Sequence, residues 1–267
     1  MDWSSQLYEK AKDAGFPERL LSQLRASPVS DAVLQYNEFM HSTVGVHSAF
    51  EAHPFGTSFE PGTPYGEAIA SATYEVTLRV CQDLYDSVFT ETTPGALLEF
   101  GVSGGYWLGR MLDHMDATRN TCDTWGFDSF EGLPAPHPEY DGDWWKEGQY
   151  AAALGDVERR LGAARRMHLR LVKGWFRDSL KAYPACTVES VSFAHIDCDL
   201  YESTKPCLEY LATRLADQSV LVFDDWTHAS NSGETKAFME WVPSVPHLAF
   251  AWIGFINSRV FLRVRHR

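Results

Sequence analysis

The stretch that decides the fold is Val191–Trp226, which begins VSFAHIDCDLYEST and ends SVLVFDDW. Two apolar runs in it, Val191–Ile196 and Ser219–Phe223, have the length and the Val, Phe and Ile content of buried strands in a parallel sheet. Between them, Tyr201–Leu215 carries leucines at helical spacing. Strand, helix and strand form a crossover unit, and right-handed crossovers bring the carboxyl ends of both strands to one edge of the sheet. The stretch therefore predicts an α/β fold.

Acidic residues follow both of these strands. Asp197 and Asp199 come after the first strand, and Asp224 and Asp225 come after the second. Ligands of open α/β sheets bind at this edge, and converging carboxylates repel one another unless a cation or a proton lies among them. Oxygen-only ligands favour Mg²⁺, Ca²⁺ or Mn²⁺ over zinc. We therefore expect a cation site here, although each acid taken alone also suits a helix cap or a solvated strand end.

The composition argues against several classes of protein. With 267 residues, 45% of them hydrophobic and 22% charged, the chain has the make-up of one large globular domain with an appendage. Its formal net charge of −13 argues against nucleic acid as a partner. The most basic stretch, Arg159–Arg170, also carries apolar positions and is interpreted as an exposed helix face. No apolar run reaches membrane-spanning length and no cleavable leader is recognisable, so no membrane partner is expected. The five scattered cysteines lack a CxxC pair, which indicates reduced thiols and a cytoplasmic protein.

The pattern of the chain changes near residue 95. Residues 1–94 contain loose helical patterns, including Tyr65–Phe89, around a segment rich in Gly and Pro, and predict a helical and lid extension. Residues 95–267 alternate strands with helices, as in a doubly wound sheet. The predicted strands are Ala96–Phe100, Thr124–Phe127, His168–Val172, Val191–Ile196, Ser219–Phe223, His247–Trp252 and Arg259–Val264. Because the last connection is too short for a helix, the last two strands are expected to form an antiparallel hairpin.

Three earlier strand ends carry residues suited to a nucleoside ligand. The first leads through the glycine turn EFGVSGG (99–105) into a predicted helix, an arrangement that presents backbone N–H groups to an anion. The second ends at Asp128, where an acid accepts hydrogen bonds from a ribose diol. The third ends at Trp175, a flat wall for an adenine ring or equally a core residue. Because GxxGG lacks the dinucleotide spacing GxGxxG, the set indicates S-adenosylmethionine, which has no pyrophosphate. The expected cofactor-binding residues are Glu99, Gly101, Ser103, Gly104, Asp128, Ser129, Gly174, Trp175 and Asp197.

Five motifs in this order, EFGVSGG, DSFEGLP, KGWFRDSL, HIDCDLYEST and VFDDW, resemble those of the macrocin- and mycinamicin-type sugar O-methyltransferases (the TylF/MycF family) over Gly95–Trp226. The resemblance implies a class I methyltransferase: a Rossmann-like, seven-stranded sheet that ends in an antiparallel hairpin. It further implies S-adenosylmethionine and Mg²⁺ (or Mn²⁺), a homodimer or higher homo-oligomer, and a role in antibiotic or other natural-product biosynthesis. Motif matching places the metal ligands of the family on Asp197, Asp224 and Asp225.

These observations lead to a hypothesis of Mg²⁺-dependent methyl transfer to a hydroxyl of a small molecule, a sugar or another vicinal diol. The cation orients the acceptor and favours its alkoxide, and Asp197 or Asp199 takes the proton. The loop 135–150 is expected to contact the substrate, or equally a second subunit. The expected substrate residues are His137, Tyr140, Trp144, Trp145 and Tyr201, and His137 and His228 are each either a base or a polar residue at the rim.

Three alternatives stay open at this point. IDCDLYE contains the DxD pattern of phosphatases of the haloacid dehalogenase type, although Tyr201 stands where a threonine or valine is usual and the upstream motifs go unused. Within the methyltransferases, the acceptor is a sugar hydroxyl, a phenolic catechol or another natural-product group. A sensor that binds the cofactor without catalysis is the third reading, and the complete acid cluster argues against it.

Overall fold

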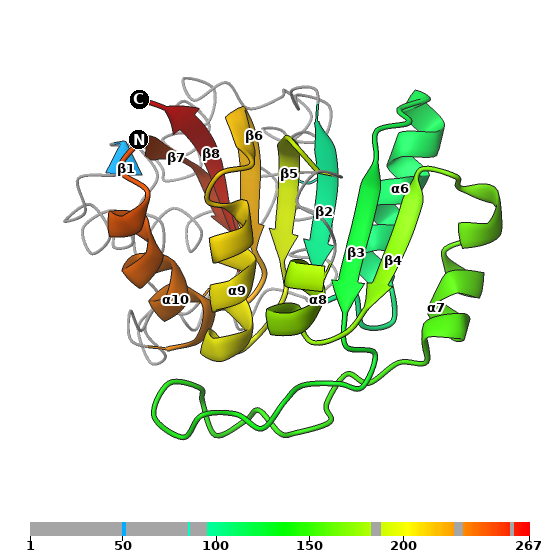
Figure 1. The fold of residues 1–267 in the computed structure, drawn as a ribbon, viewed down its shortest axis with the longest axis horizontal. Helices are drawn as coiled ribbons and strands as arrows, with labels where there is room; N and C mark the ends of the chain where they lie inside the picture. The colour runs from blue at the N-terminus through cyan, green and yellow to red at the C-terminus, as the bar shows by residue number, and fades with distance from the viewer. Residues whose placement is uncertain (1–49, 52–84, 86–94, 183–187, 227–231, 257–258) are drawn as a thin grey trace, which may run out of the picture.

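A computed structural model describes residues 50–51, 85, 95–182, 188–226, 232–256 and 259–267 of the chain. Its centre is a mixed sheet with the strand order β1-β7-β8-β6-β5-β2-β3-β4 (Figure 1). The strands are β1 (Phe50–Glu51), β2 (Ala96–Phe100), β3 (Thr124–Asp128), β4 (Leu169–Lys173), β5 (Val191–Ile196), β6 (Leu215–Phe223), β7 (Leu248–Ile256) and β8 (Arg259–His266). Strand β8 runs antiparallel to both β6 and β7, which confirms the seven predicted strands and their terminal hairpin.

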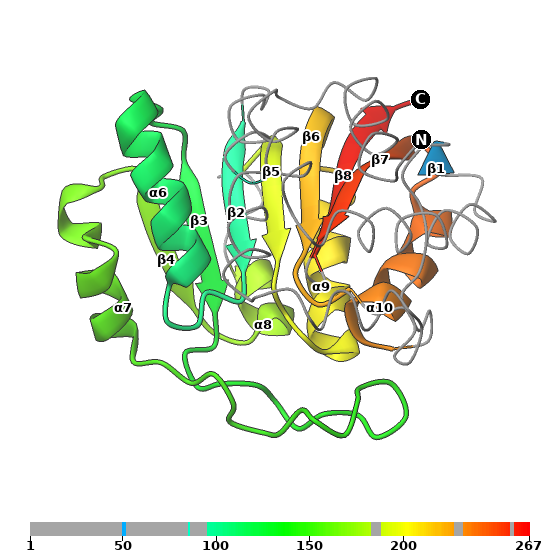
Figure 2. The same cartoon turned by 180° about the vertical axis from the view of Figure 1, so that it is seen from behind.

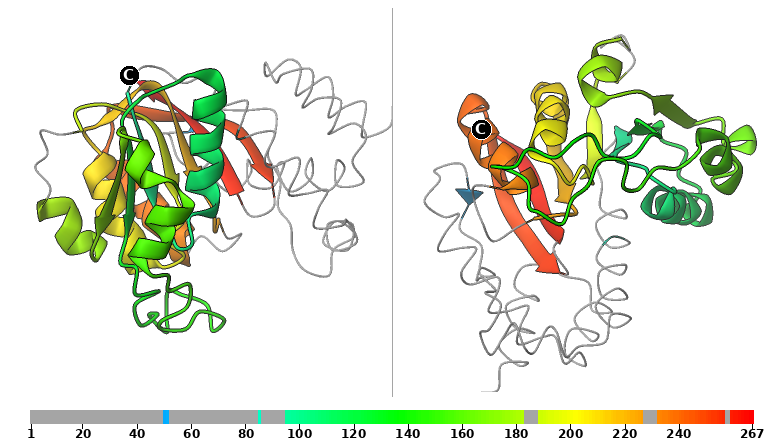
Figure 3. Two further views of the ribbon diagram at one scale, coloured as in Figure 1. Left: turned by 90° about the vertical axis from the view of Figure 1, so that its right-hand side faces the viewer. Right: turned by 90° about the horizontal axis from the view of Figure 1, so that it is seen from below.

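Helices cover both faces of this sheet. They are α6 (Tyr106–Thr118), α7 (Leu154–Arg160), α8 (Phe176–Ala182), α9 (Tyr201–Leu211) and α10 (Gly233–Trp241), with short 3₁₀ turns at η1 (Ala163–Arg165) and η3 (Val242–Ser244). Helices α8, α9 and α10 lie on one face, and α6 lies on the other (Figures 1 and 2). The side view in Figure 3 shows the sheet between these two layers. Crossovers of this kind bring the carboxyl ends of β2 to β6 to one edge, and the long segment 129–153 extends beyond that edge.

The central strands are apolar because both of their faces are covered. Every residue of β2, β3 and β5 is buried, as expected for parallel strands between two helical layers. Phe100 and Phe127 stack with their ring centroids 5.3 Å apart, and Phe238 of α10 packs edge-on against Phe223 of β6 at 5.1 Å. The polar residues at the strand ends are therefore held in position by well-packed apolar strands.

Two local predictions were wrong. The helix predicted over Tyr201–Leu215 ends at Leu211, because Leu215 already pairs with Val191 as the first residue of β6. The basic stretch 159–170 was predicted to be one exposed helix face. Instead it divides between α7, η1 and β4, and Arg166 is buried where it donates to Asp113, Asp116 and the Leu161 carbonyl.

Most of the predicted extension 1–94 lies outside the described residues. Within it, β1 pairs in parallel with β7 and adds an eighth strand that the sequence did not predict. Tyr85 is helical and buried, and its ring stacks on Trp107 at 4.4 Å. Among the described helices, none has the length and hydropathy to cross a bilayer.

Candidate active site

A cavity of about 750 Å³ opens at the carboxyl ends of β2, β3, β5 and β6. It brings together the residues that the sequence predicted from separate motifs. Of the predicted cofactor-binding residues, all except Gly174 line it, and so do all four acids Asp197, Asp199, Asp224 and Asp225. Of the predicted substrate residues, Trp145 lines it, and Tyr150 of the same loop does so as well.

The glycine turn leaves no room for a side chain at Gly101. This residue has φ +94°, and a Cβ built on it would lie 1.7 Å from the Asp197 carbonyl oxygen. Strands β2 and β5 therefore approach each other as closely as two backbones can at the point where both end. Gly105, with φ +76°, is the N-cap residue of α6. The turn lines the cavity with residues 101–104, and its glycines leave part of that backbone uncovered by side chains.

Asp128 ties the glycine turn to the end of β3. Its carboxylate accepts hydrogen bonds from the Ser103 N–H at 2.7 Å and from the Phe130 N–H at 2.5 Å. Burial raises its pKa, and these backbone donors oppose the rise. Each carboxylate oxygen has a second lone pair, so the predicted ribose contact is compatible with both bonds.

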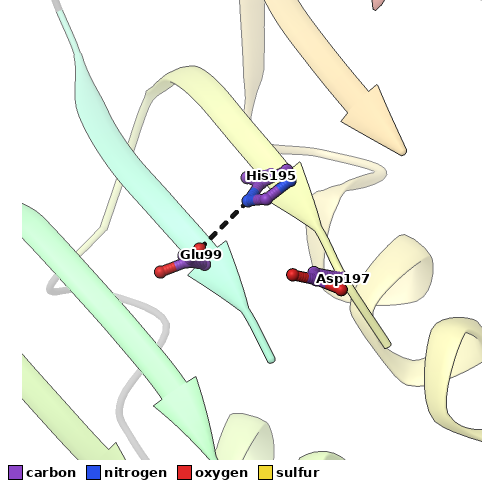
Figure 4. A group of neighbouring side chains, drawn as sticks. All are labelled: Glu99, His195 and Asp197. Carbon is purple, nitrogen blue, oxygen red and sulfur yellow. Dashed lines mark hydrogen bonds and ion pairs between the residues drawn. The ribbon is translucent and has the colours of Figure 1, made fainter. Parts of the chain in front are cut away.

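Glu99 and His195 form a buried pair across β2 and β5 (Figure 4). The two residues are register partners in the sheet, and His195 Nδ1 lies 3.0 Å from Glu99 Oε1. The second oxygen, Glu99 Oε2, has no hydrogen-bond partner among the described residues although it is buried. Glu99 lines the cavity, and a carboxyl oxygen without a hydrogen-bond donor suits the ammonium group of an amino acid ligand.

His195 also neutralises Asp224. Its Nε2 lies 2.7 Å from the Tyr85 hydroxyl and 3.4 Å from Asp224 Oδ1. Burial alone would lower the pKa of His195, but Asp224 and Glu99 raise it to about 9, so the ring is an imidazolium at neutral pH. Asp224 also accepts a 2.7 Å hydrogen bond from Arg259 Nη2. Burial opposes ionisation of Asp224, yet Arg259 and His195 keep its pKa below the ordinary value.

The other three acids form a separate group. Among the described residues, no cationic side chain donates a hydrogen bond to them. Asp197, Asp199 and Asp225 offer carboxylate oxygens that all lie within 4.8 Å of one another. Burial and then the neighbouring acids raise the pKa of Asp199 to about 10 and that of Asp225 to about 6, and Asp197 shifts in the same direction. Buried oxygen donors that repel one another fit a hard divalent cation. The family resemblance implies Asp224 as a metal ligand together with Asp197 and Asp225. In the structure, Asp199 lies with Asp197 and Asp225, and the Asp224 carboxylate contacts Arg259 and His195.

The backbone explains why Asp199 joins the group. In a fully extended strand end, alternation would keep Asp199 on the same side as Asp197. In the structure, Asp199 has φ +59°, so the chain turns after Asp197, and the two carboxylates still lie together. Left-handed backbone at a residue other than glycine costs about 1–2 kcal/mol, and such positions cluster at functional sites.

The loop 135–150, here called the aromatic loop, is held by hydrogen bonds and ring contacts against the segments that carry the acids. Asp141 is buried and accepts hydrogen bonds from the His137 N–H and the Tyr201 N–H, both at 2.8 Å. Tyr140 packs on Tyr201 at 5.0 Å, and the Lys236 ammonium lies over both rings. His137, Tyr140 and Tyr201 thus hold the loop in place and do not line the cavity, and neither does the exposed Trp144. His228 lies outside the described residues.

Sequence reasoning missed three charged residues of this site: His195, Arg259 and Glu234. His195 carried a readable signal, since a histidine inside a buried strand requires polar partners on the neighbouring strands. Arg259 and Glu234 come from elements far along the chain, and nothing in the motifs pointed to them. Glu234 is fully buried and bonds to the backbone of both acid-bearing segments.

The strand order, the terminal hairpin and the glycine turn after β2 define the class I methyltransferase fold. Within that class, residues 70–240 match the macrocin O-methyltransferase (TylF) family, and because this is more than half of the chain, the protein belongs to that family.

Two curated relatives are each similar to about half of the chain. The 8-demethyl-8-(2,3-dimethoxy-alpha-L-rhamnosyl)-tetracenomycin-C 4'-O-methyltransferase of Streptomyces olivaceus is 29% identical over 153 residues, which are 53% of this chain and 56% of the relative. The demethyldecarbamoylnovobiocin O-methyltransferase of Streptomyces niveus is 27% identical over 151 residues, with the same coverage. The chain thus spans about half the length of the curated relatives it matches.

Solved structures show the same fold. A crystal structure of a calicheamicin methyltransferase superposes with a TM-score of 0.59 at 24% identity, covering 76% of this chain and 86% of that one. The O-methyltransferase NovP superposes with a TM-score of 0.55 at 19% identity, covering 90% and 98%. Neither the family match nor these neighbours support the phosphatase alternative.

Proposed function

We propose that the protein transfers a methyl group from S-adenosylmethionine to a hydroxyl of a small natural product, with a divalent cation held by Asp197, Asp199 and Asp225. The observation that carries this proposal is one cavity that contains the Gly101 turn, the unpartnered Glu99 oxygen and the acid group together. A methyl donor and an acceptor must meet within bonding distance, and this cavity brings a site suited to each of them into one space.

For the methyl donor, the chain supplies a tight glycine turn and the carboxyl group of Glu99. Gly101 lets the ligand reach the backbone, and the turn that follows it is held by the bonds from Ser103 and Phe130 to Asp128. Glu99 Oε2 would accept from the ammonium group, while His195 orients Glu99 through Oε1 and opposes the rise that burial causes in the pKa of Glu99. Bound S-adenosylmethionine supplies an electrophilic methyl group on a positively charged sulfur, which leaves as a neutral thioether.

On the acceptor side, the chain supplies oxygen ligands and a base. A divalent cation held by the acid group would supply a positive charge that favours ionisation of a nearby hydroxyl. Asp199 and Asp197 are the candidates to take the proton of that hydroxyl. The segment 197–199 lies against the glycine turn, because Asp197 donates its N–H to the Phe100 carbonyl at 2.8 Å. The candidate bases Asp197 and Asp199 are therefore held at a fixed distance from the site proposed for S-adenosylmethionine.

The acceptor we propose is a sugar hydroxyl or another vicinal diol. The name of the Streptomyces olivaceus relative supports this class through its rhamnosyl group. Trp145 and Tyr150 line the cavity beside the acids and offer the flat apolar surfaces that suit sugar rings and polyketides. The aromatic loop also suits contact with a second subunit, so we propose a homodimer or higher homo-oligomer. We further propose that the protein acts in the cytoplasm.

Transfer of label from S-adenosyl-[methyl-³H]methionine tests the proposal. The acceptor panel comprises a rhamnosylated polyketide, a nucleotide-linked deoxysugar and a catechol, each beside its fully O-methylated form as the matched control. We expect label in the sugar acceptors only, dependent on Mg²⁺ or Mn²⁺ and lost with EDTA. Transfer to the catechol alone would change the acceptor class. Absence of S-adenosylhomocysteine binding by calorimetry would overturn the whole proposal.

A further inference from the structure

The acids at the ends of β5 and β6 stand where sheet hydrogen bonding stops. Asp197 and Asp224 still donate their N–H groups to the neighbouring strands, to the Phe100 and Ile196 carbonyls. Cys198, Asp199 and Asp225 come after these last rungs, so their buried N–H groups need other acceptors. What accepts from them determines where the carboxylates of the acid group lie.

One side chain, Glu234, accepts from all three. Its Oε1 lies 2.8 Å from the Cys198 nitrogen and 3.3 Å from the Asp199 nitrogen, and its Oε2 lies 3.1 Å from the Asp225 nitrogen. Glu234 belongs to the first turn of α10 and has no exposed surface. A single carboxylate therefore links the two segments that carry the acid group.

The placement of this carboxylate is determined by the residue before it. Gly233 has φ +49°, and a Cβ there would lie 2.9 Å from the Asp199 carbonyl oxygen. The Gly233 N–H also donates to the Tyr140 carbonyl at 2.7 Å. The start of α10 thus packs directly against the left-handed turn at Asp199, and Glu234 reaches its three donors without a flexible connection.

A carboxylate near three other acids costs electrostatic energy, since like charges in a buried site repel. A neutral side chain of similar size would fill the space without that cost. The bonding pattern gives the reason for a glutamate: with two acceptor oxygens, it holds both acid-bearing segments at once, whereas an amide of the same shape has only one acceptor oxygen.

We propose that Glu234 is a positioning residue for the cation-binding acids: it fixes Asp199 and Asp225 at the separation that a shared divalent cation requires. This inference rests on the proposed function, since it assumes that the acid group binds such a cation. Partners that orient metal ligands change metal affinity by about 10- to 100-fold when they are removed, and we expect a loss of that size here.

The experiment measures Mn²⁺ binding by electron paramagnetic resonance, Mg²⁺ competition, and S-adenosylhomocysteine binding by calorimetry in the full-length protein. Two variants separate geometry from charge. Glu234→Gln keeps the volume but has a single acceptor oxygen, and Glu234→Asp keeps the charge but is too short to reach both segments. Phe238→Leu, one turn further along α10 and equally buried, is the matched control for loosening of the helix.

We expect both Glu234 variants to lose Mn²⁺ affinity by about 10- to 100-fold, with S-adenosylhomocysteine affinity unchanged and Phe238→Leu like the wild type. Retained affinity in Glu234→Asp alone would mean that the charge matters and the positioning does not, which overturns the inference. An equal loss in Phe238→Leu would overturn it as well, by assigning the effect to the helix. If the wild type binds no Mn²⁺ or Mg²⁺, the cation of the proposed function fails first, and the inference fails with it.

Discussion

The two halves of the cavity edge are built by different means. The glycine edge (residues 99–105 and 128–130) is held by backbone: Gly101 admits no side chain beside Asp197, and Asp128 accepts from two main-chain N–H groups. The acid edge (residues 197–201 and 224–225) is held by the polar side chains of His195, Arg259 and Glu234. Steric fit fixes one half, and balanced electrostatics fixes the other.

This difference has a consequence for stability and function. A backbone cradle is stable with or without its ligand, so its residues contribute to folding and binding together. A group of buried like charges is unfavourable until a counter-ion arrives, so Asp197, Asp199 and Asp225 oppose folding and serve binding, whereas Asp224 is paired with Arg259 and His195. Substitutions at the two edges should therefore change stability in opposite directions.

The largest effect is expected for Gly101→Ala at the glycine edge. Its Cβ would overlap the Asp197 carbonyl oxygen, and φ +94° is strained for alanine. Backbone strain and overpacking together should lower the free energy of unfolding by about 4 kcal/mol and remove S-adenosylhomocysteine binding. Urea unfolding and calorimetry measure the two effects.

Gly148→Ala is the matched control, because its φ is +80° but no atom lies within 4 Å of the added Cβ. It should cost about 1 kcal/mol from backbone conformation alone and leave binding intact. Equal costs for the two alanines would show that close approach at Gly101 is not what holds the glycine edge.

The next effect is expected for His195→Phe, at the boundary between the two edges. It removes the cation that lies between Glu99 and Asp224 and leaves both carboxylates buried. Breaking such a pair should lower the free energy of unfolding by about 3 kcal/mol and weaken S-adenosylhomocysteine binding, since Glu99 loses its orientation. Phe193→Leu on the same strand is the control, with a cost of about 1 kcal/mol and unchanged binding. Unaltered cofactor affinity in His195→Phe would separate Glu99 from the donor site.

The same contrast explains how much of the site was readable in advance. At the glycine edge, the constraint is local and has a local signature: EFGVSGG must turn tightly, and only glycine fits. The strand ends and most of the predicted cofactor-binding residues of the cavity followed from such motifs, as did the seven strands and their terminal hairpin. The limits of the central strands were correct to within a few residues, because burial on both faces leaves an apolar run of fixed length.

At the acid edge, the sequence indicated the acids and not their partners. The assignment of Asp224 to the metal followed from motif matching, whereas its pairing with Arg259 depends on a hairpin that folds back from the end of the chain. Likewise, Glu234 reaches its donors only because α10 packs at one particular place. Contacts between side chains that are distant in sequence leave no periodic pattern, so neither partner was predictable from one sequence.

A smaller effect of opposite sign is expected for Asp225→Asn. In the presence of EDTA, this change relieves repulsion in the acid group and should raise the free energy of unfolding by about 1 kcal/mol. With Mg²⁺ present, the variant should gain less stability from the ion than the wild type does, and methyl transfer should fall by about 100-fold or more. Thermal melting with and without the ion tests this.

Glu158→Gln makes the same change of charge at an exposed position of α7 and should alter neither quantity. A lower melting temperature for Asp225→Asn in EDTA would contradict the idea that the acid edge opposes folding.

The smallest effect is expected for Asp116→Asn, which tests whether an exposed charge pair outside both edges contributes to stability. Asp116 accepts two hydrogen bonds from Arg166, at 2.6 and 3.1 Å, but half of its side chain is exposed. Arg166 keeps Asp113 and the Leu161 carbonyl as partners in the variant. Solvent screening therefore limits the expected cost to about 0.5 kcal/mol at pH 7.

The pH dependence of that cost has a definite sign. Hydrogen bonding to Arg166 holds the pKa of Asp116 below its ordinary value of 3.8 in the folded protein. The stabilisation is thus complete above pH 3.8 and disappears as the pH falls through the lower, folded-state pKa. Urea unfolding of wild type and Asp116→Asn at pH 7 and in acid should show the two curves converge. A difference that persists in acid would mean that Asp116 contributes through packing, and a difference of several kcal/mol at pH 7 would mean that exposed charge pairs also contribute strongly to the stability of the fold.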